Sequence, residues 1–194
     1  MTIKPSDYLE SCLHLQLTPE VKRLLDTEAS IVTFPKGHHP VRQGEEANSF
    51  YFLVYGIVQG YYLDEEGDEH TKCFGQENSF FSSECFRTNG DASFYVECLE
   101  ECKCIRIPYS TVRTLMRMDD EVQEKINRLY LEEVEKLEKR AKGLLLQDAE
   151  ERYCQFCKDY PNLQNRIPVK YIASYIGIRA SALSRIRQQL KKSL

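Results

Sequence analysis

Residues 168–190 have the sequence PVKYIASYIGIRASALSRIRQQL, which predicts two short helices joined by a tight turn. Gly177 would form the turn, because glycine adopts a positive φ at little cost. Apolar residues recur at helical spacing on one face of each helix: Ile172, Ala173 and Ile176 in the first, and Leu183, Ile186 and Leu190 in the second. These apolar faces would fix the way in which the two helices cross.

Polar side chains occupy the opposite face of the second predicted helix: Ser181, Ser184, Arg185 and Gln188. This layout is typical of a helix-turn-helix, in which apolar groups hold the two helices together and polar groups face a DNA groove. An ordinary pair of core helices with a glycine between them is the alternative interpretation.

The charge of the chain is unevenly distributed. Its 194 residues carry a net charge of −4, but residues 148–194 contain nine Lys and Arg against four Asp and Glu, a net charge of +5. A basic end on an acidic chain indicates a local surface for a polyanion. Chance variation is the alternative, which is weakened because five basic residues lie among the last sixteen: Arg179, Arg185, Arg187, Lys191 and Lys192.

Composition indicates a globular chain of one or two domains, with 42% hydrophobic and 29% charged residues. No apolar run approaches the roughly 18 residues that a membrane span needs. The first residues, MTIKPSDYLESC, lack the apolar middle of a signal peptide. We therefore expect a cytoplasmic protein that does not bind a membrane.

Eight cysteines are present: Cys12, Cys73, Cys85, Cys98, Cys102, Cys104, Cys154 and Cys157. In the cytoplasm they are expected to be reduced thiols. Cys154-x-x-Cys157 is the one close pair, and no second pair or histidine cluster accompanies it. Packing thiols are thus favoured over a redox or metal site, and no metal is predicted.

Residues 30–107 contain short runs rich in β-branched and aromatic residues, separated by turn signals: SIVTF, SFYFLVYG, IVQGYYL, HTKCF, ASFYVECL and CKCIRI. About eight strands at this spacing predict a closed β-sandwich or jelly-roll barrel, which could hold a small ligand. Before them, Thr18 followed by proline predicts a short helix over residues 18–28.

After Pro108, residues 109–117 predict one or two helical turns, and a long helix then extends to about residue 146, with Asp120 and Gln123 resembling a capping box. Another helix would begin at Asp148. The long helix has one apolar stripe: Val122, Ile126, Tyr130, Val134, Leu137, Ala141 and Leu144. A symmetry-related copy would bury this stripe in a two-fold dimer, or the stripe could pack on the barrel alone.

This order of elements resembles the Crp/Fnr family of bacterial transcription regulators. Gly44-x-x-Ala47-x-x-x-Tyr51-Phe52-Leu53-x-x-Gly56 and Glu65-Glu66-Gly67 are similar to the barrel signature of the family, and IASYIGIRASALSRI is similar to its DNA-reading motif. The resemblance covers nearly the whole chain. It implies an α+β fold: an N-terminal double-stranded β-helix (jelly-roll) barrel, a long dimerisation helix, and a C-terminal helix-turn-helix with a reduced or absent wing.

The resemblance implies three functional parts: a cyclic-nucleotide-binding-like sensor barrel over 1–118, a dimerisation helix over 119–147 and a DNA-binding domain over 148–194. The expected partners are a second copy of the chain, a two-fold symmetric double-stranded DNA operator and an unknown small-molecule effector, with RNA polymerase as a further candidate. The dimer helix would use Val122, Ile126, Tyr130, Val134, Leu137 and Ala141.

The resemblance also assigns DNA contacts. The recognition-helix arginine of the family matches Arg185, and Ser184 matches a serine just before it in many members. Ser181 stands where many members have glutamate, so one contact to cytosine is missing. Gln188 completes the outward face of the helix, and phosphate contacts are expected from Lys170, Tyr171 and Arg179.

The effector pocket matches the family less well. The phosphate-binding cassette falls within residues 75–97, where the candidate residues are Gly75, Glu84, Arg87, Ala92 and Ser93. Cyclic-nucleotide binders pair the phosphate with an arginine, and that position is Ala92 here. No serine or threonine lies between 120 and 147, where cyclic-AMP binders reach the adenine with hydroxyls. Because a buried phosphate would be unpaired, we expect no cyclic AMP and no cofactor.

A second function remains open: a small-molecule or redox sensor that acts through protein partners, with a helix-turn-helix that serves only to pack. An enzyme is not expected, because the chain has no nucleophile–base motif and no P-loop. Its four histidines are scattered along the sequence: His14, His38, His39 and His70.

Overall fold

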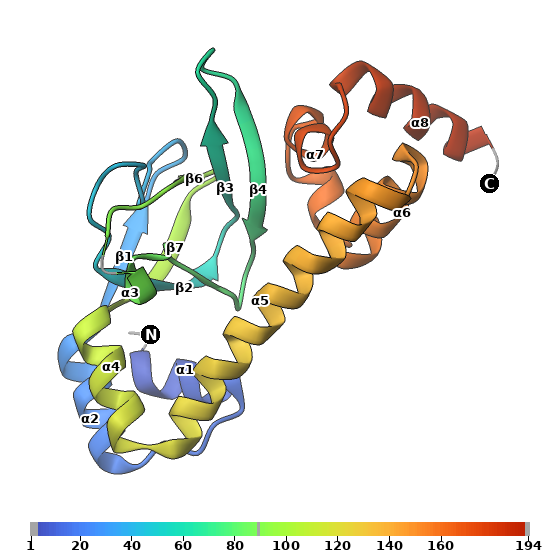
Figure 1. Ribbon diagram of the computed structural model, residues 1–194. Coiled ribbons are helices and arrows are strands. Elements are labelled where there is room, and N and C mark those ends of the chain that lie inside the picture. The colour runs from blue at the N-terminus through green and yellow to red at the C-terminus, as the bar shows by residue number, and fades with distance from the viewer. Residues whose placement is uncertain (1–3, 89, 193–194) are drawn as a thin grey trace. The chain divides into compact units, whose positions relative to one another are not determined.

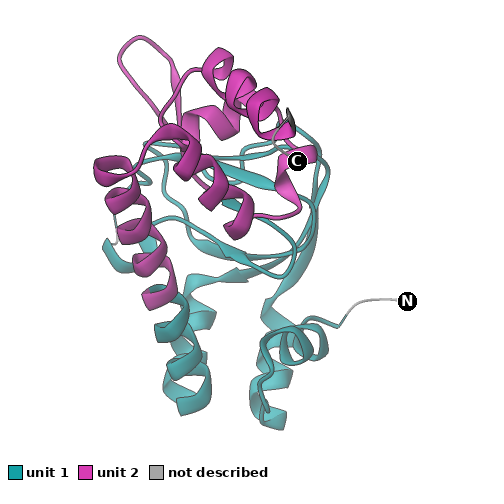
Figure 2. Ribbon diagram, turned by 90° about the vertical axis from the view of Figure 1, so that its right-hand side faces the viewer, with its two compact units in different colours: residues 1–61, 74–130 teal, residues 62–73, 131–194 magenta. Residues whose placement is uncertain are grey.

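The computed structural model of the chain describes residues 4–88 and 90–192. They form two compact units, Met1–Tyr61 with Phe74–Tyr130 (unit 1) and Tyr62–Cys73 with Leu131–Leu194 (unit 2) (Figure 2). The division lies inside the long helix and not at either of its ends. The predicted division into 1–118, 119–147 and 148–194 is by function and not by compactness, and it stays a prediction.

Unit 1 contains most of the β-structure (Figure 1). The described strands are β1 (Ser30–Phe34), β2 (Ser49–Tyr55), β3 (Val58–Leu63), β4 (Glu69–Gly75), β5 (Phe80–Phe81), β6 (Tyr95–Cys98) and β7 (Cys102–Pro108). One sheet has the order β1-β7-β2-β5 and the other β4-β3-β6. The six segments expected to be strands are confirmed. Sequence reasoning did not identify β5, which has two residues, or the isolated bridge between Val41 and Val96.

The core of unit 1 lies on strands that are buried on both faces. β2 pairs antiparallel with both β7 and β5 and is buried from Ser49 to Leu53. Phe52, Leu53 and Ile105 are fully buried. A strand covered on both faces reads as a continuous apolar run and not as an alternating one, which explains the SFYFLVY pattern.

The helices of unit 1 are α1 (Pro5–Leu13), α2 (Pro19–Glu28), α3 (Cys85–Thr88), α4 (Tyr109–Met118) and the first part of α5 (Asp120–Leu146). Thr18 caps α2 through its side chain, as expected. Sequence reasoning did not identify α1. The Ser6 N–H and hydroxyl, near the start of that helix, both donate to the Asp26 carboxylate, at 3.0 and 2.9 Å. The position of α1 is thus fixed by a residue twenty positions away.

Two predictions on the helices after the barrel were wrong. α4 has ten residues, which is nearly three turns and not one or two. The start of α5 is capped by Asp119 and not by Asp120, since the Asp119 carboxylate accepts from the N–H groups of Glu121 and Val122 at 2.9 and 3.2 Å. With Asp119 as the cap, the third helical residue is Val122, so a capping box with Gln123 cannot form.

Unit 2 contains the end of the β3–β4 hairpin, the second part of α5 and the C-terminal helices. These are α6 (Ala149–Asp159), the short 3₁₀ helix η1 (Leu163–Asn165), α7 (Val169–Tyr175) and α8 (Ala180–Lys192). Asp148 begins α6 as expected, in a capping box with Glu151. The buried residues of this unit include Phe156, Leu163, Ile172 and Leu183. Within residues 4–88 and 90–192, no helix is both long and apolar enough to cross a membrane.

Candidate DNA-binding surface and effector region

The helix-turn-helix has the predicted arrangement. α7 and α8 are joined by a turn in which Gly177 has a φ of +73°. Their facing apolar residues are buried: Ile172, Ala173, Ile176 and Leu183. Ile186 and Leu190 are half-buried further along α8. The two helices are therefore held by the apolar contacts that the sequence pattern indicated.

Gly177 is required by backbone conformation and by packing, which gives a testable prediction. A Cβ there would sit at a positive φ and 3.0 Å from Leu144 Cδ2. We expect Gly177→Ala to lower the free energy of unfolding by roughly 1–2 kcal/mol, measured by denaturant titration. Gly90→Ala is the matched control, because its φ is not positive and its nearest neighbour is 3.8 Å away. Equal midpoints for Gly177→Ala and the natural chain would contradict this account.

The outward face of α8 brings together the predicted base-reading residues, and all four are exposed: Ser181, Ser184, Arg185 and Gln188. The Ser184 hydroxyl donates to the Ala180 carbonyl at 3.0 Å, so it offers lone pairs to a ligand more readily than its proton. Arg185 has no hydrogen bond or ion pair with any other residue that the structure describes. Its guanidinium is available to a partner.

The predicted phosphate contacts lie near the starts of the same two helices. Lys170 is exposed, and its ammonium lies 4.5 Å from the centroid of the Tyr171 ring. Arg179 is exposed immediately before α8. Residues 160–194 contain seven Lys and Arg and no Asp or Glu. Such a segment attracts a phosphate backbone without internal competition from carboxylates.

Sequence reasoning missed a group of contacts beside the helix-turn-helix. The Arg140 guanidinium, on α5, donates to the carbonyl of Tyr175 at 3.1 Å, at the end of α7. The Ser174 hydroxyl, also on α7, accepts from the N–H of Thr71 on β4 at 2.8 Å. Only one signal in the sequence pointed to Arg140, namely a cation on the flank of an apolar stripe, between Leu137 and Ala141.

The effector region in unit 1 has a buried methyl group where the family resemblance placed an arginine. Ala92 is 2% exposed. Its N–H donates to the Glu45 carbonyl at 3.0 Å, and its carbonyl accepts from Gly44 at 2.8 Å. The Glu84 carboxylate accepts from the N–H of Ser93 at 2.7 Å. Two of the candidate effector residues, Glu84 and Ser93, are thus bonded to one another.

Arg87 lies on α3 and not in the cassette position, and its guanidinium is 5.9 Å from the centroid of the Tyr130 ring. Phe86 stacks on Tyr130 at 6.3 Å, and Arg113 lies 4.9 Å above the Phe86 ring. Burial raises the pKa of Tyr130 to about 12. Aromatic rings thus occupy the space between α3 and α5. The fifth candidate, Gly75, has no room for a side chain, because an added Cβ would lie 2.8 Å from Val58 Cγ2.

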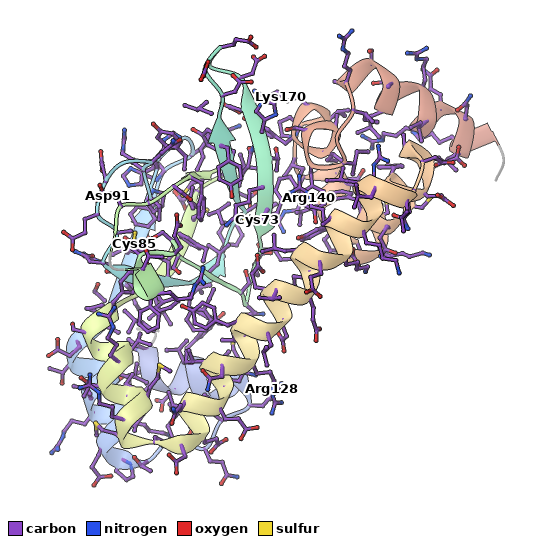
Figure 3. All side chains as sticks on the ribbon, in the orientation of Figure 1. Cys73, Cys85, Asp91, Arg128, Arg140 and Lys170 are labelled. Atoms are coloured by element: carbon purple, nitrogen blue, oxygen red, sulfur yellow. The ribbon has the colours of Figure 1, made fainter. Side chains whose placement is uncertain are left out.

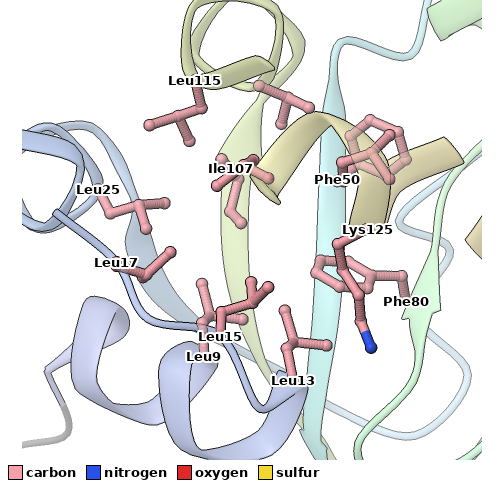
Figure 4. A pocket seen from close by; sticks show the side chains of 13 residues that line it. Leu9, Leu13, Leu15, Leu17, Leu25, Phe50, Phe80, Ile107, Leu115 and Lys125 are labelled. Carbon is pink, nitrogen blue, oxygen red and sulfur yellow. The ribbon is translucent and has the colours of Figure 1, made fainter. Parts of the chain in front are cut away.

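An apolar pocket of about 50 Å³ lies elsewhere in unit 1 (Figure 4). Leucines from α1, α2 and α4 line it together with Phe50, Phe80 and Ile107 of the sheet. Lys125 is its one charged lining residue. None of the five candidate effector residues lines this pocket. Apart from Lys125 the lining is apolar, so the pocket suits an apolar group better than a phosphate.

The apolar stripe of α5 has two parts. In unit 1, Val122 is buried, and Ile126 and Tyr130 pack against the core of the same chain. In unit 2, Val134 is 50%, Leu137 38% and Leu144 45% exposed, and Ala141 is also exposed. Packing within the chain therefore accounts for the first part and leaves the second uncovered in unit 2.

The eight cysteines are described as free thiols. Cys98, Cys102 and Cys104 are fully buried, and burial raises the pKa of Cys104 to about 12. Cys154 and Cys157 are half-buried, and in the described part of the chain neither joins a group of three metal-binding side chains. These positions fit packing thiols.

Comparisons with known proteins agree with this geometry. Residues 31–119 match the family model described as cyclic nucleotide-binding domain. The fumarate and nitrate reduction regulatory protein of Vibrio cholerae is 24% identical over 172 residues, which cover 81% of this chain and 67% of that protein. The cAMP-activated global transcriptional regulator CRP of Pasteurella multocida is 20% identical over 191 residues, or 91% of each chain.

The fold is shared with solved regulators. The structure of FixK2 from Bradyrhizobium japonicum has a TM-score of 0.76 and 19% identity to this chain, with 85% of each chain covered. A β-roll of the cyclic-nucleotide-binding type followed by a helix-turn-helix defines a transcription regulator, and both curated relatives are named as regulators and not as enzymes. The chain is thus similar, over most of its length, to transcription regulators of the Crp/Fnr type.

Proposed function

We propose that the chain is a cytoplasmic homodimer that binds a two-fold symmetric DNA operator and adjusts transcription from it. The observation that supports this function best is the exposed face of α8, where four polar side chains converge in a segment without a single carboxylate. RNA polymerase is a further proposed partner, which a regulator bound at a promoter would meet.

The base contacts of α8 follow from its exposed side chains. A helix in the major groove would present the Arg185 guanidinium to guanine O6 and N7 in a bidentate contact. Ser184 would accept from a base amino group with its free lone pairs. Ser181 is too short to replace a glutamate that accepts from cytosine. The operator should therefore differ, at the base facing Ser181, from the sites of members with glutamate.

Selection of duplexes from a random pool tests this function. The purified protein should enrich inverted repeats whose half-sites lie about 34 Å, or one helical turn, apart. Affinity should fall steeply with salt, since phosphate contacts release counterions. If no sequence is enriched and salt has no effect, DNA recognition is wrong and the sensor that acts through protein partners becomes the better interpretation.

For the effector, we propose a ligand other than a cyclic nucleotide, or a barrel that serves only as a scaffold. A cyclic phosphate keeps its negative charge at neutral pH and needs a cation when it is buried. The cassette offers the buried methyl of Ala92 instead, and both backbone groups of that residue are already bonded. Arg87, the one arginine of residues 75–97, is exposed on α3 near the Tyr130 ring.

We therefore expect no saturable heat when the protein is titrated with cyclic AMP or cyclic GMP in a calorimeter, and no change in DNA affinity. The Pasteurella multocida relative, which is named as cAMP-activated, is the positive control. Binding of cyclic AMP to this chain with a Kd of roughly 1 μM would be worth about 8 kcal/mol and would contradict the proposal.

A further inference from the structure

The C-terminal end of α7 is held by two arginines from neighbouring helices. The last carbonyls of a helix lack partners within it, and cations are favourable there. Arg140 Nε donates to the Tyr175 carbonyl at 3.1 Å, and Arg152 Nε donates to the Ile176 carbonyl at 2.8 Å. These two carbonyls immediately precede the Gly177 turn, so the anchors lie at the point that sets the direction of α8.

Arg140 also reaches β4 (Figure 3). Its Nη1 donates to the Lys72 carbonyl at 2.9 Å, and its Nη2 donates to the Thr71 carbonyl at 2.8 Å. Its guanidinium lies 4.5 Å from the centroid of the Tyr175 ring. One side chain thus joins residues of α5, α7 and β4 that all belong to unit 2. This geometry uses the planar fork of arginine, which a lysine cannot reproduce.

Ser174 adds a second link between the same two elements. Its hydroxyl accepts from the Thr71 N–H at 2.8 Å and donates to the Glu69 carbonyl at 3.2 Å. We call Arg140 and Ser174, with the backbone groups that they bind, the Arg140 clamp. The clamp joins the first half of β4 to the C-terminal end of α7 by hydrogen bonds from two side chains.

Packing around Tyr175 gives the clamp a rigid backing. The Tyr175 ring packs edge-on against Tyr160, with centroids 5.9 Å apart, and against Phe156 at 5.7 Å. Burial raises the pKa of Tyr175. A movement of α7 away from β4 would break the bonds of Arg140 either to Tyr175 or to Thr71 and Lys72, and it would break both bonds of Ser174 to β4.

We propose that Arg140 is a positioning residue for DNA binding: it fixes α7, and through the Gly177 turn α8, so that the dimer presents its two recognition helices at one spacing. The inference rests on the proposed function. A helix-turn-helix whose orientation is already fixed loses less conformational entropy when it binds DNA. It also tolerates fewer spacings between the two half-sites. Arg140 itself touches no DNA in this proposal.

Operators with altered spacing test the proposal. Arg140→Gln and Arg140→Lys should bind the selected operator roughly tenfold more weakly, as expected when hydrogen bonds to a charged group are lost. They should also lose part of the discrimination against operators with one or two base pairs inserted between the half-sites. Their salt slope should equal that of the natural chain, because no phosphate contact is removed.

Arg128→Gln is the matched control, because Arg128 lies on the same helix, is exposed, and pairs with Glu124 at 2.9 Å. It should leave affinity and spacing preference unchanged. A loss of affinity in the Arg140 variants that is equal for all spacings would indicate a general loss of stability, and a smaller salt slope would indicate a phosphate contact. Either result overturns the proposal.

Amide hydrogen exchange tests the clamp without DNA. The Thr71 N–H, protected by the Ser174 hydroxyl, should exchange faster in Ser174→Ala, which removes its acceptor, and in Arg140→Gln, whereas amides of α6 should keep their protection. Unchanged exchange at Thr71 would show that the clamp does not hold. If the natural chain selects no operator, the proposed function fails, and this measurement still decides whether the clamp exists.

Discussion

Replacing Arg185 with alanine is expected to abolish sequence-specific DNA binding while the protein stays folded and dimeric. The side chain is exposed on α8 and is bonded to no other described residue, so the fold does not depend on it. A bidentate arginine–guanine contact contributes roughly 1–3 kcal/mol of discrimination, and a dimer makes it twice, so the loss should be roughly 2–6 kcal/mol. This range corresponds to a fall in affinity of at least about 30-fold.

The measurement compares Arg185→Ala with the natural chain on the selected operator and on an unrelated duplex, at one fixed salt concentration. Binding to the operator should fall to the level of the unrelated duplex. Arg179→Ala is the control, because a lost phosphate contact weakens binding to both duplexes and reduces the salt slope. Unchanged affinity of Arg185→Ala for the operator would show that another residue reads the base.

The parts of the fold that could be predicted from sequence are those fixed by local signals. The turn between α7 and α8 needs a positive φ, and Gly177 indicated it in the sequence. The helical spacing of apolar residues on both sides of Gly177 predicted the two helices. Asp148, and Thr18 with Pro19, marked two helix starts for the same reason, since a cap is a contact between residues a few positions apart.

Contacts between distant residues could not be predicted in this way. Ser6 and Asp26 hold α1 in place across twenty positions, and nothing near Pro5 announces that pairing. Arg140 is likewise an ordinary surface cation in the sequence, and its role near the helix-turn-helix appears only when Thr71 and Tyr175 are brought beside it. Specificity of this kind resides in tertiary structure and not in periodicity.

The sequence proposed a candidate effector region, but it did not show what fills the interior of that region. Residue type indicated that Ala92 lacks a cation, and the structure adds that the methyl is buried. That Phe86 and Tyr130 stack beside α3 could not be foreseen, because these residues are 44 positions apart and belong to different helices. The candidates Glu84 and Ser93 are bonded to one another, a contact that their residue types alone did not indicate.

The same limit applies to the stripe of α5. A period of 3.6 residues shows which side chains share a face, but not what covers that face. Tertiary contacts within unit 1 bury Val122, whereas Val134 remains half exposed. In the proposed dimer a second copy would cover Val134. The residue to change in a test of dimerisation is therefore one from the exposed part of the stripe.

Val134→Glu is expected to give monomers that bind the operator weakly. Val134 is 50% exposed and Leu137 one turn further is 38% exposed, so both would be buried only by a partner. A partner can bury only the exposed half of Val134, so the substitution removes an apolar contact of roughly 0.8–1.5 kcal/mol in each subunit, and it places like charges near the two-fold axis. Because each subunit supplies one recognition helix, a monomer holds a single half-site and loses the joint contribution of the second.

Light scattering of the purified variant over a range of concentrations measures the effect, and DNA titration follows on the same samples. Leu63→Glu is the control, because Leu63 is 38% exposed but lies on β3, outside the stripe. It should remain dimeric and bind the operator normally. A Val134→Glu protein that scatters as a dimer would place the interface elsewhere. Monomers with full operator affinity would separate DNA recognition from dimerisation, because a single recognition helix would then suffice.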